Sequence, residues 1–109
     1  MNDDEALAAL AALAHPTRLD AFRRLVRAAP EGLSTGDLVE TAGLSQSTLS
    51  THLAVLVAAG LVAPEKRGRQ MIQRAAIERL RELMLFLAKD CCDGRAELCA
   101  PLAADLACC

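Results

Sequence analysis

Aliphatic residues at helical spacing, interrupted at intervals by Pro and Gly, constrain the fold of this 109-residue chain more than any other feature. Trp and Tyr are absent, and Phe22 and Phe86 are the only aromatic residues, so the core must be built from aliphatic side chains. A chain of this length makes one small domain with a modest core. Association into an oligomer is a common remedy for a core of that size.

The first two predicted helices carry apolar stripes. Residues 4–14 are apolar nearly all round, which suits a buried or subunit-facing helix. The next helix begins at His15, which we expect to act as its cap, with Pro16 in its first turn where the missing N–H costs nothing, and it ends before Pro30. In chain order, the stripes of the two helices are formed by Leu7, Leu10, Leu13, Leu19, Phe22, Leu25 and Val26.

The next segment predicts two short helices joined by a tight turn. Ser34 is a good N-cap for the first, and residues 42–44 (Ala-Gly-Leu) make the turn. Ser45 caps the second helix, over residues 46–59, and Gly60 is placed to end it in the left-handed conformation. The apolar positions of the pair are Leu38, Val39, Leu49, Leu53 and Leu56.

A basic hairpin and a longer helix complete the pattern. Residues 61–63 and 71–73 predict two short strands that flank a basic tip over residues 64–69. A helix over residues 76–90 follows, and one of its faces carries Leu80, Leu83, Met84 and Leu87. We therefore expect a mainly α fold with a small β-hairpin, arranged as a winged helix-turn-helix.

The net charge of −2 conceals a basic middle. Residues 15–81 hold ten Arg or Lys against six acidic residues, which gives +4. Residues 1–14 and 82–109 each carry a net charge of −3. A basic centre between acidic ends permits contact with phosphate.

The second helix of the helix-turn-helix opens with small polar side chains. Such side chains can approach base edges and phosphates without clashing, and the helix N-terminus itself favours phosphate. Arginines at the hairpin tip can reach along the minor groove or the backbone. We expect contacts with double-stranded operator DNA from Ser45, Gln46, Ser47, Thr48, Ser50, Thr51, His52, Arg67 and Arg69.

Three stretches together resemble the ArsR/SmtB family of metal-responsive repressors: residues 10–19 (LAALAHPTRL), residues 43–60 (GLSQSTLSTHLAVLVAAG) and the Arg-Gly-Arg tip at 67–69. The resemblance spans roughly residues 7–90 and implies a homodimeric repressor, paired through its first and last helices, that leaves its operator when an inducer binds. The chain departs from the family's sensor positions. Residues 34–36 (Ser-Thr-Gly) replace a Cys-Val-Cys signature, and the last helix lacks the His and carboxylate spacing of the family's zinc sites.

All five cysteines lie in the last nineteen residues, which divides the chain into a Cys-free domain, 1–90, and a Cys-rich segment, 91–109. Thiolates select soft ions such as As(III) and Sb(III), and some relatives that this chain resembles bind arsenite through a Cys-Cys pair and a third Cys near the C-terminus. On one continuous helix Cys91 and Cys99 would lie about 12 Å apart, so a shared ion needs a turn, which residues 93–94 (Asp-Gly) signal. We expect Cys91, Cys92 and Cys99 to bind As(III) or Sb(III) as inducer, with Cys108 and Cys109 open as further ligands.

Other readings of the thiols keep the same fold. The repressor could sense thiol oxidation or persulfides, or bind Cd²⁺, Pb²⁺ or Zn²⁺ with a fourth ligand. The chain has no catalytic triad, phosphate-binding Gly loop or paired carboxylates, which argues against an enzyme and an organic cofactor. It also has an acidic N-terminus and no apolar run of about 18–20 residues, so we expect a cytoplasmic protein without a membrane partner.

Overall fold

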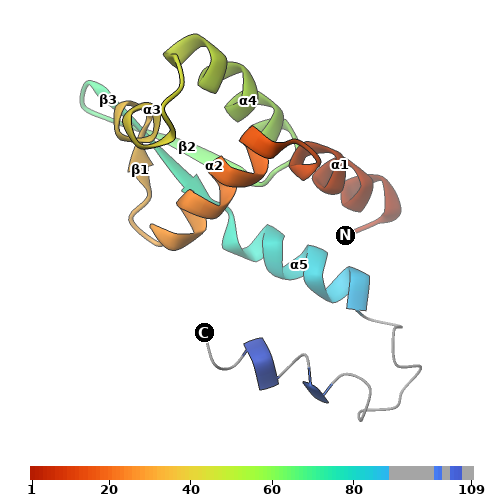
Figure 1. Cartoon of the computed structure of the whole chain (residues 1–109). Helices are drawn as coiled ribbons and strands as arrows, with labels where there is room; N and C mark the ends of the chain where they lie inside the picture. The colour runs from red at the N-terminus through yellow and green to blue at the C-terminus, as the bar shows by residue number, and fades with distance from the viewer. Residues whose placement is uncertain (89–99, 102–103, 107–109) are drawn as a thin grey trace.

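The computed structural model describes residues 1–88, 100–101 and 104–106, and it has the architecture of a winged helix-turn-helix (Figure 1). The predicted fold class, mainly α with a small β-hairpin, is confirmed. The predicted domain boundary at residue 90 lies outside the described residues. In chain order the elements are α1 (Asp3–Leu13), α2 (Pro16–Arg27), β1 (Leu33–Ser34), α3 (Thr35–Ala42), α4 (Gln46–Ala58), β2 (Val62–Arg67), β3 (Gln70–Ala75) and α5 (Ile77–Ala88).

Polar side chains fix where the first helices begin. Asn2 and Glu5 form a reciprocal capping box at the start of α1, in which the Glu5 N–H donates to Asn2 Oδ1 at 2.8 Å. His15 Nδ1 accepts the Thr17 N–H at 3.1 Å, so His15 is the N-cap predicted for α2. Ser34 likewise caps α3 as predicted. Local sequence signals therefore set these helix starts correctly.

The sheet is larger than the sequence indicated. The two-residue strand β1 was not predicted, and it pairs with β3 to give an antiparallel sheet in the order β1-β3-β2. The strands β2 and β3 pair from Val62 with Ala75 out to Arg67 with Gln70. The predicted six-residue tip therefore shrinks to the pair 68–69, because backbone pairing continues through residues that carry polar and charged side chains.

Alanines, rather than leucines, form the buried face of α1. Ala6, Ala9 and Ala12 are at most 2% exposed, whereas Leu7 is 63% and Leu10 is 39% exposed. Small side chains let α1 pack closely on α2 and α4, which turns the leucine stripe outward. Leu19, predicted in the buried stripe of α2, is likewise exposed. The rest of the core consists of Ala21, Phe22, Leu25, Leu38, Leu49, Leu53, Leu56, Leu61, Val62 and Leu83.

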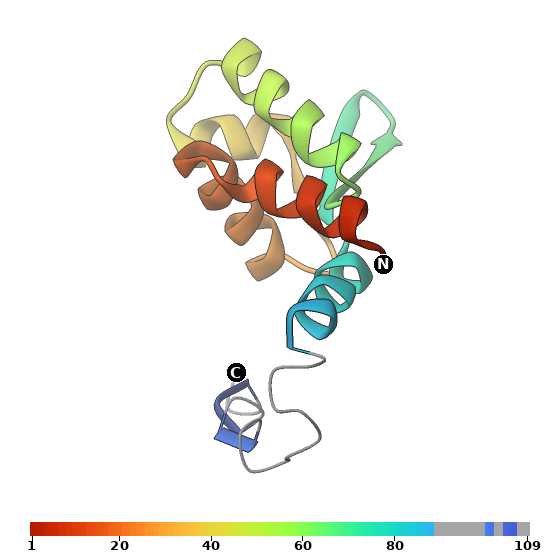
Figure 2. The same ribbon diagram turned by 90° about the vertical axis from the view of Figure 1, so that its right-hand side faces the viewer.

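The helix α5 lies next to α1, away from the hairpin tip (Figure 2). It follows the predicted helix up to Ala88, and residues 89 and 90 lie outside the described part. Leu83 is buried in the core, but Met84 and Leu87 of the same predicted face are 39% and 55% exposed. Within the described residues, no helix is long and apolar enough to span a membrane.

An ion pair joins α5 to α1. Arg79 NH1 lies 3.1 Å from Glu5 Oε2, and both side chains are partly exposed. The pKa of Glu5 is held below its usual value by the backbone N–H of Asn2, and further by the Arg79 guanidinium. The Arg79 side chain also lies beside Gly60, at the C-terminal end of α4. Arg79 therefore links α5 to α1 and to the residues that follow α4.

Candidate nucleic-acid interface

The helix pair α3–α4 is held in place by a glycine turn and a serine cap. Gly43 adopts the left-handed conformation, with φ of 69°, and its N–H donates to the Val39 carbonyl at 3.0 Å. Ser45 Oγ accepts the Thr48 N–H at 3.2 Å and thereby starts α4. The predicted inward residues of α4 are buried, so its opposite side faces out.

Six of the seven DNA-contact positions predicted on this segment are exposed, and they lie together around the first turns of α4: Ser45, Gln46, Ser47, Thr48, Ser50 and Thr51. Some of these hydroxyls are already used within the helix, since Thr51 Oγ1 donates to the Ser47 carbonyl at 3.0 Å. Gln46 and Ser50 make no hydrogen bond to another described residue through their side chains. These two side chains are therefore free to meet a base edge.

His52 lies apart from this set, is half-buried and faces the start of α2. Its ring centroid is 4.5 Å from that of His15, and its Nδ1 is 3.4 Å from NH1 of Arg18. Burial lowers the pKa of His52, and the neighbouring His15 and Arg18 lower it further. The position was recognisable from spacing, because His52 is three residues after Leu49 and four before Leu56, on the buried stripe of α4.

The two arginines predicted to contact DNA point to different faces of the hairpin. Residues alternate between the faces of a strand, so Arg67 and Glu65 share one face, where Arg67 NH2 lies 3.3 Å from Glu65 Oε2. Arg69 lies on the turn and lines a cleft on the other face, toward α4. Arg67 is thus partly neutralised, whereas Arg69 has no ion pair with another described residue.

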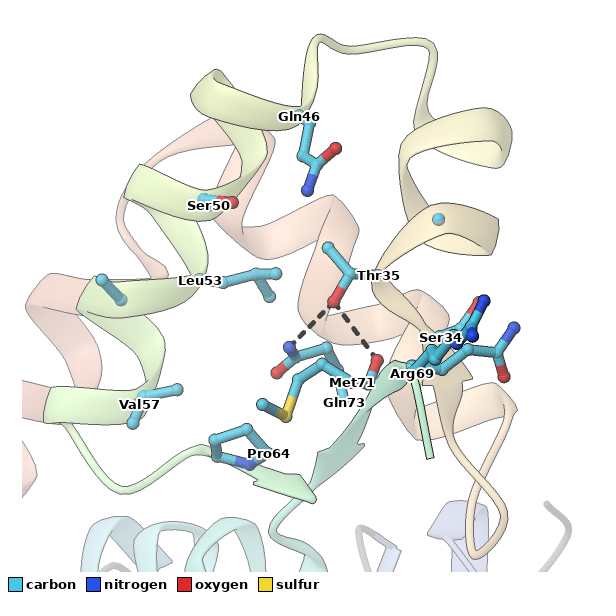
Figure 3. Close-up of a pocket in the computed structure, with 13 residues that line it drawn as sticks. Ser34, Thr35, Gln46, Ser50, Leu53, Val57, Pro64, Arg69, Met71 and Gln73 are labelled. Carbon is cyan, nitrogen blue, oxygen red and sulfur yellow. Dashed lines mark hydrogen bonds between the residues drawn. The ribbon is translucent and has the colours of Figure 1, made fainter. Parts of the chain in front are cut away.

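That cleft lies between α4, β3 and the start of α3, and it has a volume of about 580 Å³ (Figure 3). Thr35 Oγ1 donates to the Met71 carbonyl at 3.3 Å and accepts from Gln73 Nε2 at 3.1 Å. None of these three residues is distinctive in the sequence, because only the folded sheet brings them together. Gln73 is the most informative of the three, because it is a polar residue in the middle of β3 and is nevertheless buried.

The predicted metal ligands lie outside the described residues. Within them, no three His, Cys, Asp or Glu side chains lie close enough together to hold a metal ion. All five cysteines, Cys91, Cys92, Cys99, Cys108 and Cys109, fall outside the described part. The predicted thiolate site therefore stays a prediction.

Known proteins agree with the geometry of the helix-turn-helix. Residues 13–65 match a family model described as a helix-turn-helix domain. A "Probable mercury resistance operon repressor" from Streptomyces lividans is 35% identical over 90 residues, which cover 74% of this chain and 70% of that protein. A solved structure, an "ArsR-like Transcriptional Regulator from Rhodococcus sp. RHA1", superposes with a TM-score of 0.72 at 27% identity and covers 89% of both chains.

The chain belongs to the ArsR family. Proteins of this family are DNA-binding transcriptional regulators, so the chain is a repressor of that kind and not an enzyme. A "Putative arsenical resistance operon repressor ArsR2" from Halobacterium salinarum is 40% identical over 62 residues, which cover 57% of this chain and about half of that protein, 51%.

Proposed function

We propose that this ArsR-family protein is an arsenic-responsive repressor that binds operator DNA as a homodimer. In this proposal As(III), or Sb(III), binds Cys91, Cys92 and Cys99 and releases the DNA. The observation that carries the proposal is the concentration of all five thiols directly after α5, in a chain whose described residues hold no other metal-binding cluster. A relative named as an arsenical resistance repressor supports the choice of ion.

DNA binding would use the exposed first turns of α4. Gln46 and Ser50 would face base edges in the major groove, and Arg69 would contact phosphate or the minor groove beside it. A dimer presents two such helices, which must meet half-sites about 34–36 Å apart. Any change in how the subunits pair would therefore change operator affinity.

The thiol segment is connected to α4 through α5. The Ala76 N–H, immediately before α5, donates to the Leu61 carbonyl at 2.8 Å, three residues after α4 ends. Arg79 of α5 also lies beside Gly60, close enough that a Cβ there would come within 2.9 Å of Nε. A movement of α5 would thus reach the C-terminal end of α4. A coupling free energy of about 1–3 kcal/mol would weaken operator binding about 5–150-fold.

Fluorescence anisotropy with a labelled palindromic duplex, selected from a random library, tests the proposal. Arsenite should release the wild-type protein, and Cys91→Ser, Cys92→Ser and Cys99→Ser should each bind DNA normally but lose most of that response. Cys108→Ser and Cys109→Ser are the matched controls within the same segment. If all three variants respond to arsenite like the wild type, the assignment of the ligands is wrong.

The alternative inducers have distinct signatures. Hg(II) is one alternative inducer, because one relative is named as a mercury resistance repressor. Cd²⁺, Pb²⁺ and Zn²⁺ are others, because thiolates bind all of them. X-ray absorption on the arsenite complex counts sulfur ligands, for which three are expected. A redox or persulfide sensor would instead gain a disulfide or sulfur mass after peroxide or polysulfide, as measured by intact-mass spectrometry.

A further inference from the structure

The cleft between α4 and the hairpin is graded from polar to apolar. Met71 and Gln73 are two residues apart on β3 and share its face toward α4, and Arg69, on the turn, lines the same cleft. The opposite wall is a stripe of α4 at helical spacing, formed by Gln46, Ser50, Leu53 and Val57. Together these walls enclose about 580 Å³, which is within the range of small-molecule sites.

Gln73 holds a buried, unsatisfied acceptor in the wall of this cleft. Its side chain is 6% exposed, and Nε2 is committed to Thr35 Oγ1 at 3.1 Å. Thr35 in turn donates to the Met71 carbonyl, which fixes the amide with its oxygen turned toward α4 (Figure 3). Gln73 Oε1 is buried and has no hydrogen-bond partner among the described residues. A buried acceptor without a partner favours any ligand that brings a donor.

The surroundings of Gln73 define the rest of such a ligand. Leu53, Val57 and Pro64 supply apolar walls, and the flexible side chain of Met71, 39% exposed, lines the same cleft. Arg69 lies four residues from Gln73, or about 13 Å along an extended strand. The long, flexible Arg69 side chain can reach back along part of that distance. A molecule with a donor at one end and an anion at the other, separated by one ring, can therefore bridge Gln73 and the Arg69 guanidinium.

We propose that this cleft is a second ligand site, for a small aromatic molecule that carries a hydroxyl group at one end and an anionic group at the other. The hydroxyl donates to Gln73 Oε1, the Met71 side chain moves aside, and the anionic group pairs with Arg69. Binding itself does not depend on the function proposed above. Its consequence does: because Gln46, Ser50 and Arg69 would also contact DNA, the bound molecule competes with the operator.

Isothermal titration calorimetry on the whole chain tests the site, with 4-hydroxybenzoate as probe. We expect one molecule per chain, with benzoate (no donor) and phenol (no anion) each binding about 5-fold more weakly. In Gln73→Leu the preference for 4-hydroxybenzoate over benzoate should disappear, and in Arg69→Gln the preference over phenol should disappear. Absence of binding at millimolar probe, or unchanged preferences in both variants, overturns the proposal.

A variant that fills the cleft tests probe binding without changing the buried Gln73 amide. Ala54 lines the cleft and is exposed, so Ala54→Phe should fold and abolish probe binding. Ala58→Phe is the matched control, because Ala58 is an exposed α4 residue that does not line this cleft. If Ala54→Phe binds the probe as the wild type does, the molecule binds elsewhere and the assignment falls.

Competition is measured separately, by anisotropy on the selected duplex. The probe should raise the apparent Kd for DNA of the wild type and leave that of Gln73→Leu nearly unchanged. Probe binding without competition would overturn the regulatory role. Since the calorimetry contains no DNA, failure of the ligand site and failure of the repressor function give different results.

Discussion

At the scale of single residues, the lowered pKa of His52 makes stability depend on pH. The folded chain holds the pKa of His52 below its usual value of about 6.5, chiefly by burial and then through His15 and Arg18. The unfolded chain therefore binds more protons near that pH. The stabilising contribution of neutral His52 is present above about pH 6.5 and is lost as the pH falls toward the folded pKa. We expect the urea midpoint to fall between about pH 7.5 and pH 5.5, and to fall less in His52→Gln. Equal pH slopes for the two proteins would contradict this account.

These histidines also show which side-chain contacts could be predicted from the sequence and which could not. His15 was correctly predicted as a cap, because capping depends only on residues two or three positions away. The spacing of α4 places His52 beside the buried leucines, but its partners, His15 and Arg18, come from another element and could not be named from that spacing. The all-round apolar character of α1 left open which face is buried, and close packing on alanine decides it. Local signals were sufficient wherever the interaction was local.

At the scale of elements, Ser45 at the start of α4 both stabilises the helix and lies at a proposed DNA contact. Ser45 accepts the Thr48 N–H, so Ser45→Ala should cost about 1 kcal/mol in the free energy of unfolding and fray the first turn. Ser45→Asp keeps a capping oxygen and should retain the stability, yet its charge should repel phosphate and weaken DNA binding. Urea denaturation and anisotropy measured on both variants separate the two effects. Equal loss of stability in both would exclude Ser45 as the cap.

The helices of this chain could be predicted almost to the residue, whereas the sheet and the cleft could not. Caps, glycine turns and helical spacing all act within a few residues of α2, α3 and α4. The strand β1 has only two residues and owes its existence to pairing with β3, forty positions away in the chain. Gln73 becomes a candidate ligand-binding group only in the folded sheet, where β3 pairs with β1 and its side chain is buried. Long-range pairing of this kind leaves little trace in the pattern of a single sequence.

At the scale of the whole molecule, Leu7 of α1 and Leu87 of α5 belong to the surface that a partner subunit would cover. Leu7 is 63% and Leu87 is 55% exposed, although the two helices otherwise pack on the core. In Leu87→Asp, pairing would bury a carboxylate without a partner, so the dimer should weaken at least about 10-fold. Leu85, 62% exposed, is the matched control, because it lies about 160° around α5 from Leu87.

Sedimentation equilibrium of Leu87→Asp and Leu85→Asp measures the effect on pairing. If α1 and α5 form the dimer surface, only Leu87→Asp should shift toward monomer, and it alone should lose operator affinity, since a monomer engages one half-site. Thermal unfolding of both variants checks that neither change damages the core. If Leu85→Asp were the variant that dissociates, the opposite face of α5 would pair the subunits. The cysteine segment would then follow a helix whose dimer-forming face had been wrongly assigned.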